Sequence, residues 1–221
     1  MTERRALRVQ LLDGFSIWFP DGRVVGRFER PSARRLFEAL LLRPGRRAGR
    51  EELAEILFPR LAPKRASNAV SKALTMARAA LEPEGTGLLA ADRSTIWIRE
   101  DVPIEVDLDV HLTALKAALA EPNLARRDEL LEAALAERGR LLDDELYADW
   151  AIAARDELER WRAQARLALA RGRSAGQGPV GLTGSIEAWG DVAANDPASE
   201  EACIGLVRAC AAGGQLILEI G

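Results

Sequence analysis

The stretch with the strongest chemical character runs from Lys64 to Leu81, where cationic and amide side chains follow one side of a predicted helix. Apolar residues at helical spacing form the opposite side, namely Ala66, Ala69, Val70, Ala73, Leu74 and Ala77. The polar side holds Arg65, Asn68, Ser71, Lys72, Thr75 and Arg78. Cationic groups pair with phosphates or guanine edges, an Asn amide pairs with adenine, and a Thr methyl contacts thymine. The pattern fits a helix that reads duplex DNA, and it also fits an ordinary amphipathic surface helix.

Charge is distributed unevenly along the 221 residues. Residues 1–99 contain 19 Lys and Arg against 11 Asp and Glu, a net charge of +8. Residues 100–221 contain 12 against 23, a net charge of −11, so the whole chain carries −3. A basic half followed by an acidic half indicates two domains with different partners. Nucleic acid is the commonest polyanion that a basic domain attracts.

The segments before the cationic helix predict short strands and two further helices. Alternating apolar and polar residues in Leu7–Ile17, with a turn at Asp13-Gly14, predict two strands, and Val24-Val25 predicts a third. Pro31-Ser32 opens a first helix with Ser32 as its expected N-cap, and a second helix covers about Arg50–Phe58. These elements form a small α+β domain that supports the cationic helix.

The segment after the cationic helix predicts a β-hairpin. Leu88–Ala90 and Thr95–Ile98 are strand-like and flank a turn that places Arg93 at its tip. Three helices followed by a hairpin is the order of a winged helix-turn-helix domain. In that arrangement the third helix enters the major groove, and the hairpin reaches an adjacent groove or phosphate.

All segments after residue 107 predict helices joined by short breaks. We expect them at Val110–Ala120 (capped by Asp109), Asn123–Glu137, Ala148–Ala170, Leu182–Ala194 and Ala198–Ala212. Gly172–Gly181 contains four glycines and one proline and predicts a connector. Antiparallel helix pairs of this length are typical of a tetratricopeptide-like stack. The predicted fold is therefore mixed, with a winged helix DNA-binding domain over residues 1–102 and an all-α tetratricopeptide-like domain over residues 103–221.

Several stretches resemble one family of bacterial regulators. Residues 7–98 resemble the winged-helix domain of the antibiotic-regulatory (SARP) transcriptional activators, a branch of the OmpR/PhoB-type fold. The matching stretches are Leu7–Phe15, Leu40–Arg46, Arg50–Glu55 and Ala66–Pro83. Residues 104–213 resemble the bacterial transcriptional activator domain that follows in that family. The matches there are Val106–Val110, Gly139–Leu142, Tyr147–Trp150, a long helix, and Trp189 with Asp196-Pro197 and Glu201-Ala202.

The resemblance implies binding to direct-repeat promoter DNA and recruitment of RNA polymerase. It places Arg65, Asn68, Ser71, Lys72, Thr75 and Arg78 toward DNA and Arg93 on the wing. The chain departs from the family at Ser67, where relatives often carry Arg, and residues 214–221 do not continue the repeat pattern. Many relatives carry an ATPase module, but this chain has no Gly-x-x-x-x-Gly-Lys-Ser/Thr loop. It is therefore a short regulator or the N-terminal part of a longer one.

No constellation of residues predicts catalysis or metal binding. His111 is the only histidine, and there is no Gly-x-Ser-x-Gly nucleophile elbow. We expect Cys203 and Cys210 to be buried reduced thiols, and Trp150, Trp161 and Trp189 to pack between helices. The acidic group Asp143, Asp144, Glu145 and Asp149 predicts a solvated loop and helix start. We expect no enzyme activity, no cofactor and no metal, and a cytoplasmic location without membrane contact.

The sequence therefore predicts a sequence-specific transcriptional regulator, an activator, that binds double-stranded promoter DNA. The helical domain would form a homodimer, sense a small-molecule effector or contact RNA polymerase. Two alternatives remain open. The chain could be a protein–protein scaffold whose winged helix does not bind DNA, or a sensor that holds a nucleotide or another small molecule in its helical domain.

Overall fold

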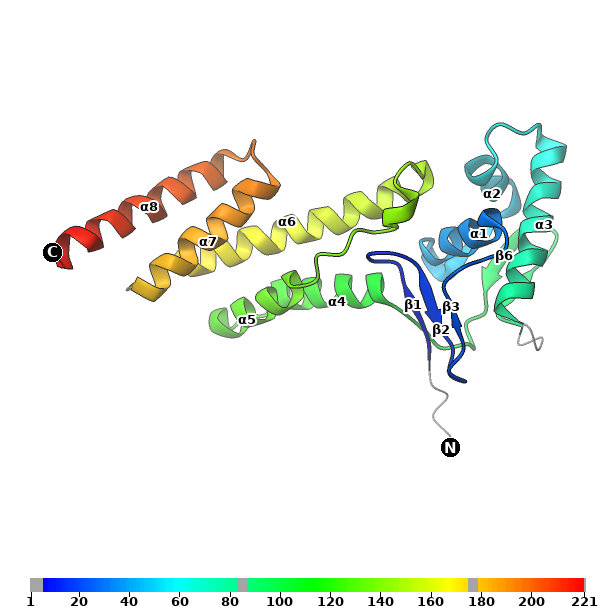
Figure 1. The fold of residues 1–221 in the computed structure, drawn as a ribbon, viewed down its shortest axis with the longest axis horizontal. Coiled ribbons are helices and arrows are strands. Elements are labelled where there is room, and N and C mark those ends of the chain that lie inside the picture. Colours follow the sequence, from blue (N-terminus) through cyan, green and yellow to red (C-terminus); the bar gives the residue numbers. More distant parts are fainter. Residues whose placement is uncertain (1–5, 83–86, 175–178, 221) are drawn as a thin grey trace. The chain divides into compact units, whose positions relative to one another are not determined.

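The computed structural model describes residues 6–82, 87–174 and 179–220 and divides the chain into two compact units (Figure 1). The first unit combines the chain up to Asp109 with Gly139–Arg155. The second combines Val110–Arg138 with the chain from Asp156 onward. The chain thus leaves the first unit, returns to it, and leaves again.

A four-stranded sheet opens the first unit. It consists of β1 (Leu7–Gln10), β2 (Ser16–Trp18), β3 (Val24–Val25) and β7 (Ile104–Val106), in the order β3-β2-β1-β7. The three predicted strands are confirmed. Asp13 and Gly14 have φ angles of 57° and 119°, so the predicted turn uses the left-handed region that glycine adopts without strain. The sequence did not predict β7, which pairs in parallel with β1, because three residues before a helix carry no strand signal of their own.

Three helices form the core of the first unit. They are α1 (Pro31–Leu41), α2 (Arg50–Leu57) and α3 (Pro63–Leu81). Leu36, Phe37, Leu40, Leu53 and Val70 are fully buried between them. The prediction that Ser32 caps α1 is wrong. The helix begins at Pro31, so the N-cap lies two residues earlier than predicted, at Arg30, which makes no side-chain hydrogen bond. Pro31 already has the φ angle of a first helical residue.

The predicted hairpin forms a second, three-stranded sheet in the first unit. β5 (Leu89–Ala91) and β6 (Thr95–Ile98) pair in antiparallel fashion, and β4 (Arg47–Gly49) pairs with the other edge of β6. The unpredicted β4 follows the short helix η1 (Pro44–Arg46), where Gly45 has a φ angle of 62°. Ile96 and Ile98 are buried, so the hairpin is anchored in the same core as the helices.

The returning segment Gly139–Arg155 packs on α1 and on the loop after β1. It holds η2 (Asp143–Glu145) and η3 (Asp149–Ala151). Leu141 forms an isolated bridge with Leu12, and Leu141 and Leu142 are buried. The compact units therefore do not follow the boundary predicted between residues 102 and 103, because both β7 and this segment pack into the first unit. The division into functional domains stays a prediction.

The acidic group in this segment is exposed at Asp143, Asp144 and Asp149, as predicted, but two of its members form ion pairs that the sequence did not predict. Asp144 pairs with Arg34 at 2.5 Å, and Glu145 pairs with Arg35 at 2.8 Å. Both arginines lie on α1, and Glu145 has a side-chain exposure of only 17%. The sequence could not show this, because the partners are 110 residues apart.

The second unit is built from five helices, and the first residues of two of them, α4 and α6, belong to the first unit. They are α4 (Asp107–Ala120), α5 (Leu124–Leu135), α6 (Ile152–Ser174), α7 (Pro179–Asn195) and α8 (Glu200–Ile220). All five helices were predicted, with different ends. Asp109 lies in the first turn of α4 and does not precede it. Asn123 caps α5 through a 3.0 Å hydrogen bond from the Arg126 N–H to its Oδ1.

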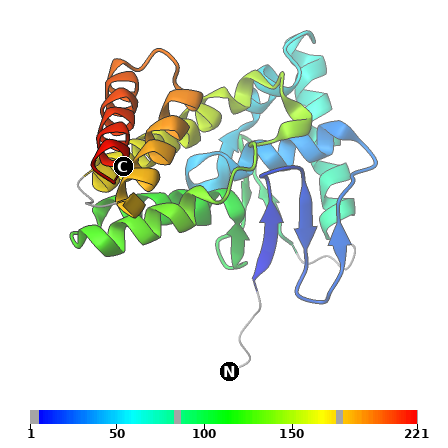
Figure 2. The ribbon, with the colours of Figure 1, turned by 60° about the vertical axis from the view of Figure 1, so that its left-hand side comes forward.

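Two clusters of buried residues hold these helices together, and Figure 2 shows α7 and α8 running beside each other. One joins α4, α5 and α6 through Leu115, Ala118, Leu131, Ala134, Ala165 and Leu169. The other joins α6, α7 and α8 through Ala170, Ala188, Trp189, Val192, Ala202 and Ala209. Residues 175–178 of the predicted Gly172–Gly181 connector lie outside the described residues. The tetratricopeptide-like repeat stays a prediction.

The tryptophan and cysteine predictions have different outcomes. Trp189 is buried, with its indole N–H donating to Ser174 Oγ at 2.7 Å, and Trp161 packs against the first cluster. The prediction that Cys203 and Cys210 are buried is wrong, because both thiols lie on the exposed side of α8. Residues seven apart share one helix face, but that face is the outer one here.

Within the described ranges, no helix combines the length and apolar character needed to cross a bilayer.

Candidate nucleic-acid interface

Helix α3 separates its apolar and polar residues onto opposite faces. Its inner face contributes Ala66, Val70, Ala73, Leu74, Ala77 and Leu81, all buried. Its outer face exposes Arg65, Asn68, Ser71, Lys72 and Thr75. These positions repeat at helical spacing, so their side chains leave the helix in one direction. The packing of α3 on α1 and α2 thus presents a polar face made almost entirely of hydrogen-bond donors and acceptors.

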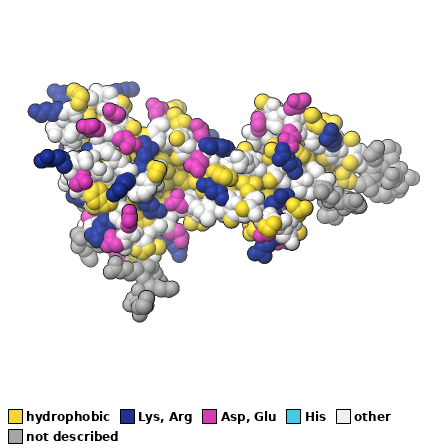
Figure 3. All heavy atoms as spheres, turned by 180° about the vertical axis from the view of Figure 1, so that it is seen from behind, with side chains coloured by type: hydrophobic (Ala, Val, Ile, Leu, Met, Phe, Trp, Pro, Cys, Tyr) yellow, Lys and Arg dark blue, Asp and Glu magenta, His cyan; other side chains and the backbone are white. Residues whose placement is uncertain are grey.

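The outer face of α3 is cationic. Over its 19 residues the helix contains Lys64, Arg65, Lys72 and Arg78 and no acidic residue. Lys64, Arg65 and Lys72 form no ion pair with any described residue. In the view from behind, Lys and Arg side chains project at the edge that α3 forms (left in Figure 3). Unneutralised cations on a rigid helix attract the phosphates of a nucleic acid.

Two hydroxyl groups on this face hydrogen-bond within the helix. Ser71 Oγ donates to the Ser67 carbonyl at 3.2 Å, and Thr75 Oγ1 donates to the Ser71 carbonyl at 3.1 Å. Each oxygen retains an acceptor lone pair, and Thr75 retains its methyl group. The Asn68 side chain makes no hydrogen bond with a described residue, so both its donor and its acceptor are available for the bidentate contact that adenine requires.

The turn of the β5–β6 hairpin is held by Asp92. Its Oδ1 accepts hydrogen bonds from the N–H groups of Ser94 at 2.8 Å and Thr95 at 2.7 Å. The hydrogen bond from Ser94 is the largest cause of the lowered pKa of Asp92, so the turn favours the ionised carboxylate. Arg93 lies at the tip of this turn, exposed and without an ion pair among the described residues. The turn therefore presents one free cation.

Arg50 connects the hairpin turn to α3. Its Nε donates to the Asp92 carbonyl at 3.0 Å, and its Nη1 lies 3.4 Å from Ser71 Oγ. Its backbone N–H also donates to the Ser94 carbonyl at 2.8 Å. One residue at the start of α2 thus contacts both α3 and the turn. Sequence reasoning missed Arg50, because nothing in its local pattern shows that its partners come from two distant segments.

Arg78 differs from the other predicted contact residues. It is half-buried, and its Nε and Nη2 both donate to the Leu89 carbonyl, at 3.1 and 2.9 Å. Its guanidinium therefore ties the end of α3 to the first strand of the hairpin. Together, Arg50 and Arg78 link the hairpin to α3 at two points. The structure brings the five exposed predicted residues of α3 together on one face and places Arg93 on the linked hairpin.

His111 is a buried residue that hydrogen-bonds to a neighbouring helix. Its Nε2 accepts a hydrogen bond from Arg162 Nε at 3.1 Å, and both side chains are buried. Burial, followed by the charge of Arg162, lowers the pKa of His111, so the neutral imidazole is favoured. In the part of the chain that the structure describes, no group of three or more His, Cys, Asp or Glu residues could hold a metal ion.

The elements define a winged helix followed by a helical domain. A solved structure of similar fold is Mycobacterium tuberculosis EmbR in complex with a low affinity phosphopeptide, with a TM-score of 0.71 and 22% sequence identity. The match covers 92% of this chain and 54% of the EmbR chain, so the chain spans about half the length of that protein. No protein-family model matches the sequence, and no curated protein matches it. At this identity the likeness shows the fold.

Proposed function

We propose that this protein is a DNA-binding transcriptional regulator of the SARP type that places α3 in the major groove of promoter DNA. The observation that carries the proposal is the outer face of α3, which is cationic, free of acidic residues and exposed. The major groove of B-DNA admits one helix, and a helix that enters it needs donors toward base edges and phosphates. The likeness to EmbR supports the winged-helix fold, which is the fold that this proposal requires.

In this proposal the contact residues have different roles. Arg65 and Lys72 bind phosphates or guanine edges, Asn68 reads adenine, and Ser71 and Thr75 line the groove. Arg93 on the hairpin binds a phosphate of the adjacent groove. Arg50 and Arg78 hold the hairpin at a fixed distance from α3 through the hydrogen bonds to Asp92 and Leu89. We further propose that the helical domain provides dimerisation or contact with RNA polymerase.

The polar outer face also separates this proposal from a scaffold function. A winged helix that docks on another protein through α3 would need apolar side chains on that face, because the centres of protein interfaces are depleted in charge. All five exposed contact residues of α3 are polar or charged instead. This composition favours a phosphate-rich partner.

Fluorescence anisotropy with labelled duplex DNA of random sequence tests the proposal. We expect binding at low salt that weakens steeply as the salt concentration rises, because phosphate contacts release counterions. Lys72→Gln should reduce the slope of log affinity against log salt by about 1, as the loss of one phosphate contact does. Arg160→Gln removes the same charge from an exposed position of α6 and serves as the matched control. Binding that is undetectable at low salt, or equal slopes for both variants, would contradict the proposal.

A further inference from the structure

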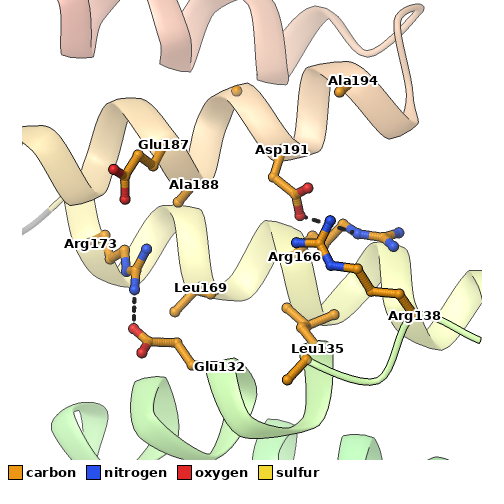
Figure 4. Close-up of a pocket in the computed structure, with 12 residues that line it drawn as sticks. Glu132, Leu135, Arg138, Arg166, Leu169, Arg173, Glu187, Ala188, Asp191 and Ala194 are labelled. Carbon is orange, nitrogen blue, oxygen red and sulfur yellow. Dashed lines mark hydrogen bonds and ion pairs between the residues drawn. The ribbon is translucent and has the colours of Figure 1, made fainter.

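A pocket of about 580 Å³ lies within the helical unit, between α5, α6 and α7 (Figure 4). Its apolar surface comes from Leu135, Leu169 and Ala188. The volume lies in the range of about 300–1,000 Å³ that small-molecule sites occupy. The pocket lies entirely in the second unit and contains none of the DNA-contact residues.

One end of the pocket has an excess of positive charge. Arg166 and Arg138 both reach the end where Asp191 lies (Figure 4). Arg166 Nε is 3.4 Å from Asp191 Oδ2, and its side chain is only 13% exposed. Its other carboxylate neighbour, Glu159, is 3.9 Å from Nη1 and does not line the pocket. Arg138 is exposed and forms no ion pair with a described residue. At this end of the pocket, the lining therefore contains two guanidinium groups and one carboxylate.

The other end has an excess of negative charge. Arg173 is already paired with Glu132 across the pocket. Glu187 lies on the same side as this pair and forms no ion pair within the described residues (Figure 4). The two ends therefore carry opposite unpaired charges, separated by an apolar surface. A ligand that matches both ends must carry an ammonium group and an acidic group on an apolar body.

The separation of the two charged ends follows from α7. Glu187 and Asp191 are four residues apart on this helix, which corresponds to about 6 Å along its axis. Because Arg166 Nε lies 3.4 Å from Asp191 Oδ2, Asp191 marks the level of the cationic end. An extended peptide advances about 3.3–3.6 Å per residue. A single α-amino acid is too short for this separation. Two extended residues span about 7 Å and match it, and three span about 10 Å, a difference that the long side chains of Arg138 and Glu187 can accommodate.

We infer that the pocket is a binding site for a free di- or tripeptide with apolar side chains. Its ammonium group pairs with Glu187, its carboxylate pairs with Arg138 and Arg166, and its side chains rest on Leu135 and Leu169. An arginine pair suits a carboxylate because each guanidinium offers planar donors. The site is defined by both termini, so it excludes the internal segment of a longer protein chain.

Gly190 offers a way to close the pocket without disturbing the fold. It lines the pocket, and a Cβ added to it would meet no atom within 4 Å. A leucine at this position would occupy ligand space. It would also favour the helix, because glycine is a poor residue for a helix interior. Gly190→Leu should therefore abolish binding while leaving the melting temperature unchanged or higher.

Isothermal titration calorimetry of the full chain with leucyl-leucine, alanyl-leucine and trileucine tests the inference. We expect saturable binding of at least one of these peptides. N-acetylation or C-terminal amidation of that peptide should each weaken binding at least about tenfold, because each removes one charged hydrogen-bonding group from the ligand. Arg138→Gln and Glu187→Gln should have effects of the same size. Arg160→Gln and Glu129→Gln, exposed positions outside the pocket, are the matched controls.

Three results would overturn the inference. They are no binding by any of the three peptides at millimolar concentration, equal binding of the free and blocked peptides, and binding that Gly190→Leu leaves intact. The titration contains no DNA, so its result tests the peptide site separately from the DNA-binding proposal.

Discussion

Glu38 gives the first unit a defined pH dependence. The side chain lies on α1 with no exposed surface, its Oε1 accepts from Arg34 Nε at 2.6 Å, and its Oε2 has no hydrogen-bond partner among the described residues. Burial raises the pKa of Glu38 from 4.5 to about 7, although the charge and hydrogen bond of Arg34 oppose this rise. Glu145 and Asp144, which also face the carboxyl group, raise its pKa further.

The direction of the effect follows from proton linkage. Between pH 4.5 and about pH 7 the folded chain retains the Glu38 proton, whereas the unfolded chain has released it. The contribution of Glu38 to stability is therefore largest below pH 4.5 and is lost as the pH rises through about 7. A shift of this size corresponds to about 3 kcal/mol. Glu38→Gln, which cannot ionise, should lack this contribution to the pH dependence.

Urea unfolding of the wild type and of Glu38→Gln near pH 4.5, 6 and 8 measures the effect. The difference in the free energy of unfolding should change by about 3 kcal/mol across this range, in favour of the variant at the highest pH. Comparing the two proteins at each pH removes the contribution of all other titrating groups. Glu51→Gln, an exposed acid on α2, should parallel the wild type. A wild-type-to-Glu38→Gln difference that stays constant with pH would refute the reasoning.

Two further predictions concern a hydrogen-bonded contact and a packing contact. Arg78→Ala should lower the free energy of unfolding by about 1–2 kcal/mol in urea titrations, because the Leu89 carbonyl loses both of its guanidinium donors; an unchanged value would show that these hydrogen bonds contribute nothing. Gly205→Ala should lower the melting temperature, at a cost of about 1–3 kcal/mol, because its Cβ would overlap the indole ring of Trp189. Gly190→Ala, in open space, should raise the melting temperature, and equal effects of the two alanines would contradict this account of the α7–α8 contact.

The elements that the sequence predicted well are those whose signals are local. The apolar spacing of α3 fixes which side is buried, so the five exposed contact residues follow from periodicity alone. The β5–β6 hairpin follows from two short strands around a turn. Each of these features depends on residues close together in the chain.

The features that the sequence did not predict depend on distant partners. β4 and β7 have three residues each and become strands only because β6 and β1 offer edges to pair with. The attachment of Gly139–Arg155 to the first unit rests on the bridge of Leu141 with Leu12, on the burial of Leu141 and Leu142, and on ion pairs with α1. All of these contacts join segments far apart in the chain. The engagement of Arg78 by Leu89 also requires the folded hairpin, and its position on α3 predicts only that it lies near the polar face.

An NMR titration of the isotope-labelled full chain with duplex DNA tests the central claim most directly. If α3 enters the major groove, the largest changes in amide chemical shift should occur at Arg65–Thr75 and at the turn Asp92–Ser94, and they should diminish as salt is added. Changes confined to α5–α8, with α3 and the turn unaffected, would contradict the account.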